Sequence, residues 1–406
     1  MINNFIVIGT VLLVLMLLFK RSIRLSPMWR ATVTPLASII GSGFLISAPL
    51  LILTTGKFAV FVMLGIVIIA FSLGSSLRFN IKYSEPQLEK HDKGNAAVLF
   101  LESISRPVLG IAYIISVAFY LKLLAAFALR WTGSSSLILE NSLTTALLLF
   151  IGITGKIRGL SLLESLETYS VNIKLSIIVA LVAGHIAFNF DSLLANDWHL
   201  SIYPHEGWVP TIKKLLGMLI IIQGFETSRY LGHAYSTKIR IQSMKNAQII
   251  SGIIYVVFIA STLTAFNDIH SLNETTVIEI CKMIAPVLPF LLIIAAVMSQ
   301  FSAAVADTIG SGGLLAEATK RKISVNTSYL LITCSGIALT WLTNIYTIIT
   351  IASKAFSVYY ILQLLISITL LTKQKSIRKN KSSLVLYCIL LLLMFSVLIF
   401  SIPVKL

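Results

Sequence analysis

The stretch LLGMLIIIQGFETSRYLG, residues 215–232, decides the fold because it is a membrane-length apolar segment with a polar interruption at its centre. About 20 apolar residues cross a bilayer as a helix, but here Gly224 and Glu226 stand in the middle. Glycine weakens a helix by about 1 kcal/mol relative to alanine. A broken helix is tolerated in lipid only where its freed backbone lines a cavity or the protein interior. The stretch therefore predicts a membrane helix interrupted at a buried site.

A second stretch, PLASIIGSGFLISAPLL (residues 35–51), has glycines at the corresponding place, Gly41 and Gly43. Each interruption would expose carbonyl oxygens at one half-helix end and N–H groups at the other, with matching partial charges. Such a pair can hold a zwitterion, with its carboxylate at the N–H groups and its ammonium at the carbonyls. We therefore expect two broken helices; the alternative is that the glycines only let helices pack closely.

Apolar segments of this length recur along the whole chain. The hydrophobic fraction is 57%, charged residues are 12% and mean hydropathy is +0.91, whereas a soluble domain averages about 25% charged residues. The sequence predicts an all-α integral membrane protein with about twelve transmembrane helices and no sizeable soluble domain. The predicted spans are residues 4–19, 32–53, 57–77, 97–128, 137–154, 161–189, 212–234, 246–266, 282–311, 327–345, 347–371 and 383–403.

The net charge of +16 reflects topology rather than a nucleic-acid partner. With the N-terminus outside, the inside loops hold 21 of the 32 Lys and Arg residues, and the outside loops hold three. This is the positive-inside bias, so we expect both termini outside, in a bacterial inner (plasma) membrane. The lipid bilayer is an expected partner, with a minor term for anionic lipid. The scattered Cys281, Cys334 and Cys388 predict neither a metal site nor a disulfide, and no cofactor motif is visible.

The order of the spans predicts an inverted repeat. Residues 32–190 hold five spans and residues 191–372 hold five more. An odd number of helices per block inverts the second copy, as in many transporters. Residues 1–31 then form an extra N-terminal transmembrane helix with a basic inner loop, and residues 373–406 form a peripheral C-terminal helix.

At these motifs the chain resembles the amino acid–polyamine–organocation (APC) superfamily, the amino acid permeases with the LeuT-type fold. Residues 40–44, IGSGF, resemble the family's G-S-G-I-F signature, and residues 224–226, GFE, resemble its G-F-E. The segment ESLETYSVNIKLSIIVALVAG (164–184) is similar to the family's fifth helix, including a lone lysine. Residues 236–240, STKIR, depart from the family's E-x-x-N-P, so the resemblance does not name the substrate.

The resemblance spans residues 32–372 and implies a five-plus-five inverted repeat. It also implies a secondary transporter that carries an amino acid, an amine or a similar small zwitterion by alternating access. The substrate carboxylate is expected at the N–H groups of the first break, and its amine near the carbonyls of the second. Glu226 could hold the amine, sense protons or form a gate, with helix capping as the alternative. Candidate substrate-binding residues are Gly41, Ser42, Gly43, Phe44, Tyr113, Ile222, Gln223, Gly224, Phe225 and Glu226.

Polar residues inside the spans are candidates for coupling and gating, because an ionisable group at the membrane centre costs about 2.5–3.5 kcal/mol or more. In the resembled family a lysine at the place of Lys174 can occupy the position where sodium-coupled relatives bind sodium. This favours protons or simple exchange over sodium, with a structural ion pair as the alternative. The candidates are Lys174, Asp307, Ser299, Ser302, Arg229 and Lys354.

Each of these candidates has its own alternatives. Asp307 could partner Lys174, line the inner exit or sit among headgroups. Arg229 could pair with Glu226 or mark the inner mouth, and Lys354 could gate the outer side or extend to the headgroups. An enzyme is not expected, since no H-E-x-x-H, nucleophile elbow or phosphate loop is visible. A channel or sensor on the same fold, and a sodium-coupled symporter, remain open.

Overall fold

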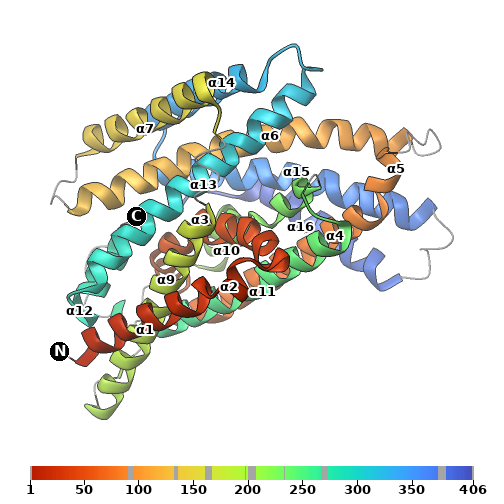
Figure 1. Ribbon diagram of the computed structural model, residues 1–406. Coiled ribbons are helices and arrows are strands. Elements are labelled where there is room, and N and C mark those ends of the chain that lie inside the picture. Colours follow the sequence, from red (N-terminus) through yellow and green to blue (C-terminus); the bar gives the residue numbers. More distant parts are fainter. Residues whose placement is uncertain are drawn as a thin grey trace.

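The computed structural model describes residues 2–89, 96–131, 136–160, 167–196, 198–199, 207–232, 234–266, 273–373 and 381–404. Within these ranges all regular structure is helical. Figure 1 shows long helices packed side by side, with the two chain termini toward the same end of the bundle. The predicted all-α membrane fold is confirmed.

The long helices follow the predicted spans closely. Nine stretches of the described chain are long and apolar enough to cross a membrane, and one of them, Pro27–Gln87, contains both α3 and α4. The long helices in these stretches are α3 (Pro27–Thr55), α4 (Ala59–Tyr83), α6 (Ala96–Trp131), α7 (Leu137–Arg158), α9 (Glu167–Leu194), α11 (Thr237–Thr262), α13 (Leu288–Ala318), α14 (Val325–Leu342), α15 (Ile345–Lys373) and α16 (Lys381–Phe400). Two further segments correspond to predicted spans: the shorter apolar helix α1 (Ile2–Phe19), and the broken segment of α10 (Trp208–Gly217), η3 (Leu219–Ile222) and η4 (Phe225–Leu231). Shorter helices are α2 (Arg21–Arg24), η1 (Gly56–Phe58), α5 (Glu85–Glu89), η5 (Leu263–Phe266) and α12 (Thr276–Ile284).

The helices fall into two packing groups. Helices α6, α7, α13 and α14 pack against one another and are called the scaffold group; α7 and α14 lie side by side along one edge of Figure 1. Helices α3, α4 and α11 pack around η3 and η4 and are called the broken-helix group. Helix α15 contacts α6 of one group and α4 of the other, while α1 packs on α9 and α16 packs on α15. The repeat boundaries at residues 31, 190 and 372 stay a prediction.

One end of the bundle carries most of the positive charge and is called the basic end. Side-chain contacts join neighbouring helices here: Lys156 Nζ of α7 lies 3.0 Å from Thr327 Oγ1 of α14, and Arg106 of α6 pairs with Glu317 of α13 at 3.0 Å. Its basic residues in the described chain are Lys20, Arg21, Arg24, Arg30, Arg78, Lys82, Arg106, Lys156, Arg158, Lys238, Arg240, Lys245, Lys320, Arg321, Lys322, Lys373 and Lys381.

Helix α3 corrects one prediction, because it runs unbroken from Pro27 to Thr55. Its glycines serve close packing instead. A Cβ on Gly41 would lie 2.8 Å from the Cβ of Ala303 in α13, and a Cβ on Gly43 would lie 2.8 Å from the Cα of Ile221 in η3. The predicted interruption of residues 35–51 is therefore wrong. The backbone N–H groups there belong to a continuous helix, which leaves no half-helix end to receive a carboxylate.

Candidate functional site

The predicted interruption of residues 215–232 is confirmed. The helix stops at Gln223 and Gly224, between η3 and η4. Gly224 has φ +120°, a backbone conformation that a residue with a side chain rarely adopts. A Cβ there would also lie 2.7 Å from the backbone nitrogen of Ile39 in α3. Gly224 is thus needed both for the turn of the chain and for the close crossing of two segments.

Tyr255 of α11 joins the two segments that cross at this point. Its hydroxyl lies 3.0 Å from the carbonyl oxygen of Ile39 and 2.8 Å from that of Ile221. The hydroxyl thus ties η3, just before the break, to the continuous helix α3 through one backbone carbonyl oxygen of each. Sequence reasoning missed Tyr255, since no motif marks it.

Glu226 begins the second half of the broken helix and is fully buried. Its Oε2 accepts hydrogen bonds from the Gly224 N–H and from the Tyr360 hydroxyl, both at 3.0 Å. Its Oε1 has no hydrogen-bond partner among the described residues. The Phe225 ring stacks on the Tyr360 ring with centroids 5.5 Å apart and planes 10° apart. One carboxylate oxygen is thus fixed beside aromatic rings while the other is available to a ligand.

Tyrosines of α6 form the facing wall. The Tyr113 ring lies 6.0 Å from the Phe356 ring, and its hydroxyl has no partner in the described chain. The Tyr120 hydroxyl accepts a hydrogen bond of 3.2 Å from the Gln223 side chain. The structure therefore links predicted residues of α6 to the break, through the Tyr120–Gln223 hydrogen bond and through the rings of Phe356 and Tyr360 in α15.

Lys174 of α9 lies at the junction of α3 and α13 and is fully buried. Its ammonium donates to the Ala37 carbonyl oxygen at 3.0 Å and to the Ser299 hydroxyl at 3.3 Å. Asp307 is buried on the same helix as Ser299, about 12 Å further along its axis. A positive charge thus lies between a backbone carbonyl and a hydroxyl, both of which are ligands that small cations also use.

A cavity of about 510 Å³ leads from the basic end toward the break. Tyr113, Thr227 and Gly310 line it, and Arg106 and Glu317 are among its lining residues nearer the surface. These last two side chains are 41% and 56% exposed, so their ion pair contributes about 1 kcal/mol at most. The broken helix is therefore approached from the basic end.

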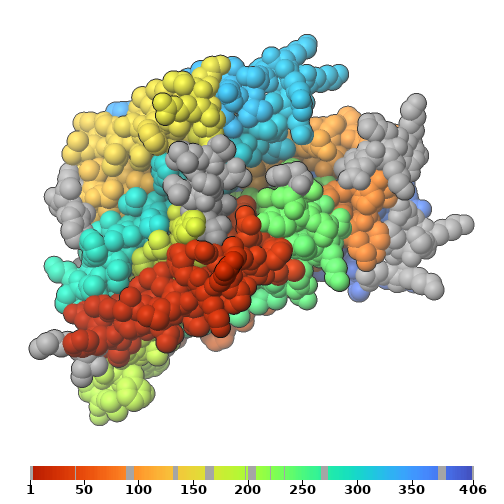
Figure 2. Space-filling view, in the orientation of Figure 1, coloured from red at the N-terminus to blue at the C-terminus, as the bar shows by residue number. Residues whose placement is uncertain are grey.

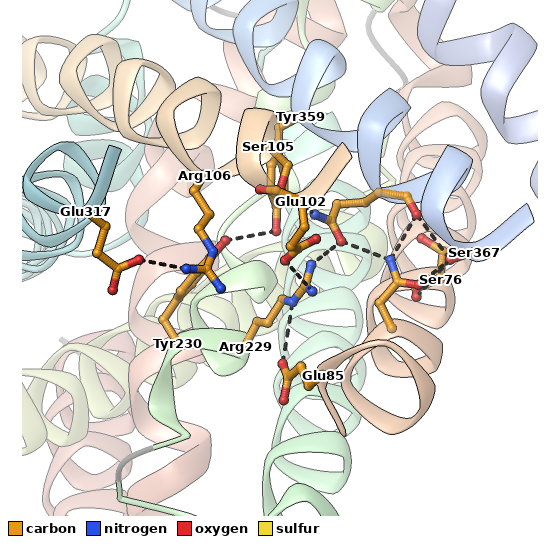
Figure 3. Close-up of polar contacts among 12 residues, drawn as sticks. Ser76, Glu85, Glu102, Ser105, Arg106, Arg229, Tyr230, Glu317, Tyr359 and Ser367 are labelled. Atoms are coloured by element: carbon orange, nitrogen blue, oxygen red, sulfur yellow. Dashed lines mark hydrogen bonds and ion pairs between the residues drawn. The ribbon is translucent and has the colours of Figure 1, made fainter. Parts of the chain in front are cut away.

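Arg229 of η4 lies in the wall of this cavity and carries a buried charge network (Figure 3). Its guanidinium contacts Glu102 of α6 at 2.6 Å and Glu85 of α5 at 3.4 Å, and it donates to the side-chain oxygen of Gln363 in α15. The hydrogen bonds of Glu226 go to Gly224 and Tyr360 instead. Of the two predictions for Arg229, a place at the mouth of the cavity fits these contacts.

Further residues complete the network. Arg240 contacts Glu85 at 2.6 Å and donates to the Arg229 carbonyl oxygen at 2.7 Å. The Gln363 amide donates to the Ser105 hydroxyl at 3.1 Å and accepts from Asn80 at 2.9 Å. Because every charge has a partner of opposite sign, the low-dielectric interior tolerates the cluster.

The sequence analysis did not single out Glu102 and Lys122, two buried charged residues inside the predicted span 97–128. Glu102 is 4% exposed and Lys122 is 3% exposed. The Lys122 ammonium donates to the carbonyl oxygens of Thr340 at 3.0 Å and Thr343 at 2.8 Å, at the C-terminal end of α14. A cation suits that end of a helix. The rule that singled out Lys174 would have found both residues.

The remaining candidates are less directly placed. Phe44 packs on Phe258 with centroids 4.3 Å apart, so it belongs to the α3–α11 packing. Ile222 is buried at the end of η3, and the Ser302 hydroxyl has no partner in the described chain. Lys354 is half-buried in α15. The Ser42 side chain lies outside the described part of the chain, and the roles of all these residues stay predictions.

Comparison with known families gives a match over nearly the whole chain. A family model described as "APC superfamily transporter" matches residues 21–401. A protein of Aquifex aeolicus (strain VF5), described as uncharacterized, is 42% identical over 370 residues, which cover 90% of each chain.

Solved structures share the fold. Mhp1, a nucleobase-cation-symport-1 family transporter in a closed conformation with bromovinylhydantoin bound, superposes with a TM-score of 0.57 at 12% identity, over 90% of this chain and 91% of that one. A Na⁺-coupled sialic acid symporter in a substrate-bound outward-open state gives 0.55 at 13% identity, over 100% and 99%. At these identities the likeness concerns the LeuT-type fold alone.

Proposed function

We propose, from the premise that the chain belongs to the APC superfamily of transporters, that it is a secondary transporter of an amino acid or a similar small zwitterion. The observation that carries the proposal is the free oxygen of Glu226, a fully buried carboxylate in the break of a membrane helix. Placing an ionisable group inside the membrane costs folding free energy, so such a group indicates a functional site. A cavity that reaches Thr227, the neighbouring residue, supports access to it.

The proposed binding mode places the ammonium of the substrate at Oε1 of Glu226. The stacked rings of Phe225 and Tyr360 lie beside this carboxylate and would contribute cation–π attraction, worth about 2 kcal/mol when desolvated. Tyr113, whose hydroxyl lacks a partner in the described chain, would meet a polar group of the substrate. A primary amine without a carboxylate shares this ammonium and is the second substrate class that the site fits.

Lys174 supports coupling to protons, or plain exchange, over coupling to sodium. Its ammonium already occupies the space between the Ala37 carbonyl and the Ser299 hydroxyl. A sodium ion placed there would meet a fixed positive charge at close range, which is strongly unfavourable in a low dielectric. A lysine that releases and rebinds a proton there would change the attraction between α9, α3 and α13 during the cycle.

A transport assay with an altered Glu226 tests the proposal. We expect purified protein in liposomes to accumulate at least one amino acid or amine when a proton gradient or internal substrate is supplied. Glu226→Gln is expected to reduce this uptake about 100-fold, because a neutral amide loses a charge-assisted hydrogen bond to the ammonium, worth about 1.5–3 kcal/mol, and disturbs the Tyr360 contact.

Glu279→Gln is the matched control for that assay. Glu279 of α12 pairs with Arg130 of α6 and is 40% exposed, outside the candidate site. Its uptake should equal that of the unaltered protein. Absence of uptake of every amino acid and amine in the screen, or equal uptake by Glu226→Gln, would refute the proposed site.

Alternating access would come from movement of the broken-helix group against the scaffold group. The Arg229–Glu102 contact crosses between these groups, whereas Arg229–Glu85 and Glu85–Arg240 stay beside the broken helix, since α5 follows α4 directly. We infer that Glu102 holds the conformation in which the cavity is open to the basic end. By the positive-inside rule this end faces the cytoplasm.

Glu102→Gln is therefore expected to favour the opposite conformation. Gly313 lines the cavity and has room for a side chain. The rate at which a thiol reagent labels Gly313→Cys therefore measures access to the cavity from the basic end. In a background without the three native cysteines, we expect its labelling rate to fall about tenfold in Glu102→Gln, as a charged hydrogen bond is worth about 1.5–3 kcal/mol.

Glu85→Gln is the control for this measurement, because it leaves the Arg229–Glu102 contact in place. Its labelling rate should stay within about twofold of the starting protein. Equal loss of labelling in both variants would mean that the network only stabilises the fold.

A further inference from the structure

A second cavity lies at the basic end, away from the broken helix. Its volume is about 360 Å³, and it is formed between the start of α3, with α2 before it, and the third and fourth turns of α11. In Figure 2 the red N-terminal segment lies against the green surface of later helices in this part of the molecule. The cavity is lined by Ser22, Ile23, Ser26, Met28, Trp29, Thr32, Asn246, Ile249 and Ile250.

The polar lining of the cavity suits phosphate oxygens. Ser22 and Ser26 contribute hydroxyls, each of which can donate a hydrogen bond. The Asn246 side-chain oxygen accepts a 2.9 Å hydrogen bond from Gln242, and an amide oriented in this way keeps its NH₂ group as a donor. Because the lining residues offer hydrogen-bond donors and include no carboxylate, the cavity favours an anionic group over a cation.

The apolar lining continues in the direction of the membrane centre. The Trp29 indole N–H donates to Asn172, so the ring presents its apolar face to its other neighbours. Along α11, Ile249 is 42% exposed and Ile253 is 60% exposed. Residues four apart lie on one face of a helix, so these two side chains form an exposed apolar strip that starts at the cavity.

The two segments that form the cavity, residues 20–32 and 237–253, carry only positive charge. Lys20, Arg21, Arg30 and Lys245 are exposed, and Arg24 is half-buried with its guanidinium 5.9 Å from the centre of the Tyr169 ring. Neither residues 20–32 nor residues 237–253 contain an Asp or Glu. Basic residues close to a membrane attract anionic headgroups, and this cluster borders an apolar strip of the membrane-facing surface.

We propose that this cavity binds one anionic phospholipid from the leaflet at the basic end. Its phosphate would lie among the Ser22, Ser26 and Asn246 donors, with Arg21 and Arg24 nearby. One acyl chain would follow Ile249 and Ile253 along α11. The lipid would bridge α3 and α11, two members of the broken-helix group, at the end where the cavity toward the broken helix opens. This proposal does not depend on which solute the protein transports.

Native mass spectrometry of the full chain with phosphatidylglycerol tests the proposal, with phosphatidylcholine as the neutral competitor and inorganic phosphate as the free anion. Arg21→Gln combined with Arg24→Gln is expected to weaken phosphatidylglycerol binding about 30-fold, since each basic residue near an anionic surface contributes about fivefold. Ser26→Trp should block the cavity itself; Ser26 makes no side-chain capping hydrogen bond, so the helix start is not lost with it.

The matched control removes three positive charges elsewhere on the basic end, Lys320→Gln, Arg321→Gln and Lys322→Gln. It should bind phosphatidylglycerol as the unaltered protein does. Equal weakening in this control would show that binding follows total charge, and equal binding of phosphatidylcholine would show that no anion is recognised. Displacement by millimolar inorganic phosphate alone would show a free-anion site. Each of these results would overturn the proposal, whereas selective loss in the first two variants supports it.

Discussion

Replacing Gly224 by alanine is expected to abolish transport and to destabilise the folded protein by about 2–5 kcal/mol. Two costs add at this residue. Its φ of +120° strains any residue that has a Cβ, and that Cβ would lie 2.7 Å from the backbone of Ile39. The Ile39 backbone cannot give way, since it is part of the main chain of a buried helix. Apparent melting temperature in detergent and uptake into liposomes measure the two effects.

Gly65→Ala is the matched control for this substitution. Gly65 lies inside α4, and a Cβ there would meet nothing within 4 Å. The substitution should be neutral or stabilising by up to about 1 kcal/mol, because alanine is the better helix former. If Gly224→Ala keeps normal uptake and stability, the observed break is not the conformation that the protein uses.

Replacing Lys174 by alanine is expected to reduce coupled uptake about 100-fold, which corresponds to about 2.7 kcal/mol. The substitution leaves the Ala37 carbonyl and the Ser299 hydroxyl without the ammonium that joins them. If protons are taken up and released at Lys174, the remaining uptake should also lose its dependence on a pH gradient. Uptake measured with and without such a gradient, at constant membrane potential, checks both results.

Lys122→Ala is the control, since Lys122 is likewise a buried lysine that donates to two oxygens. It joins α6 to α14 within the scaffold group and should lower stability without changing the pH dependence of uptake. An unaltered pH dependence in Lys174→Ala, or the same loss in Lys122→Ala, would exclude the proton role. Sodium-stimulated uptake by the unaltered protein would instead favour the symporter alternative.

Local composition was enough to predict the membrane class and the helical fold. Lipid selects helices whose apolar length matches the bilayer, and this length can be counted in any stretch such as residues 383–403, which closely match α16. The break at Gly224 was also predictable, because a glycine beside a carboxylate weakens a helix wherever the segment lies. The resemblance of residues 40–44 and 224–226 to family motifs added the fold type.

The tertiary structure decided what each unusual residue is for. Gly41 and Gly43 look like a second break in the sequence, yet α3 is continuous, because Ala303 and Ile221 approach so closely that only glycine fits. Arg229 stands three residues after Glu226, but it pairs with Glu102, which is far away in the chain. Backbone preference and burial follow from neighbours in sequence. The partner of a buried charge, and the reason for a glycine, follow from neighbours in space, and those are set only when distant helices pack together.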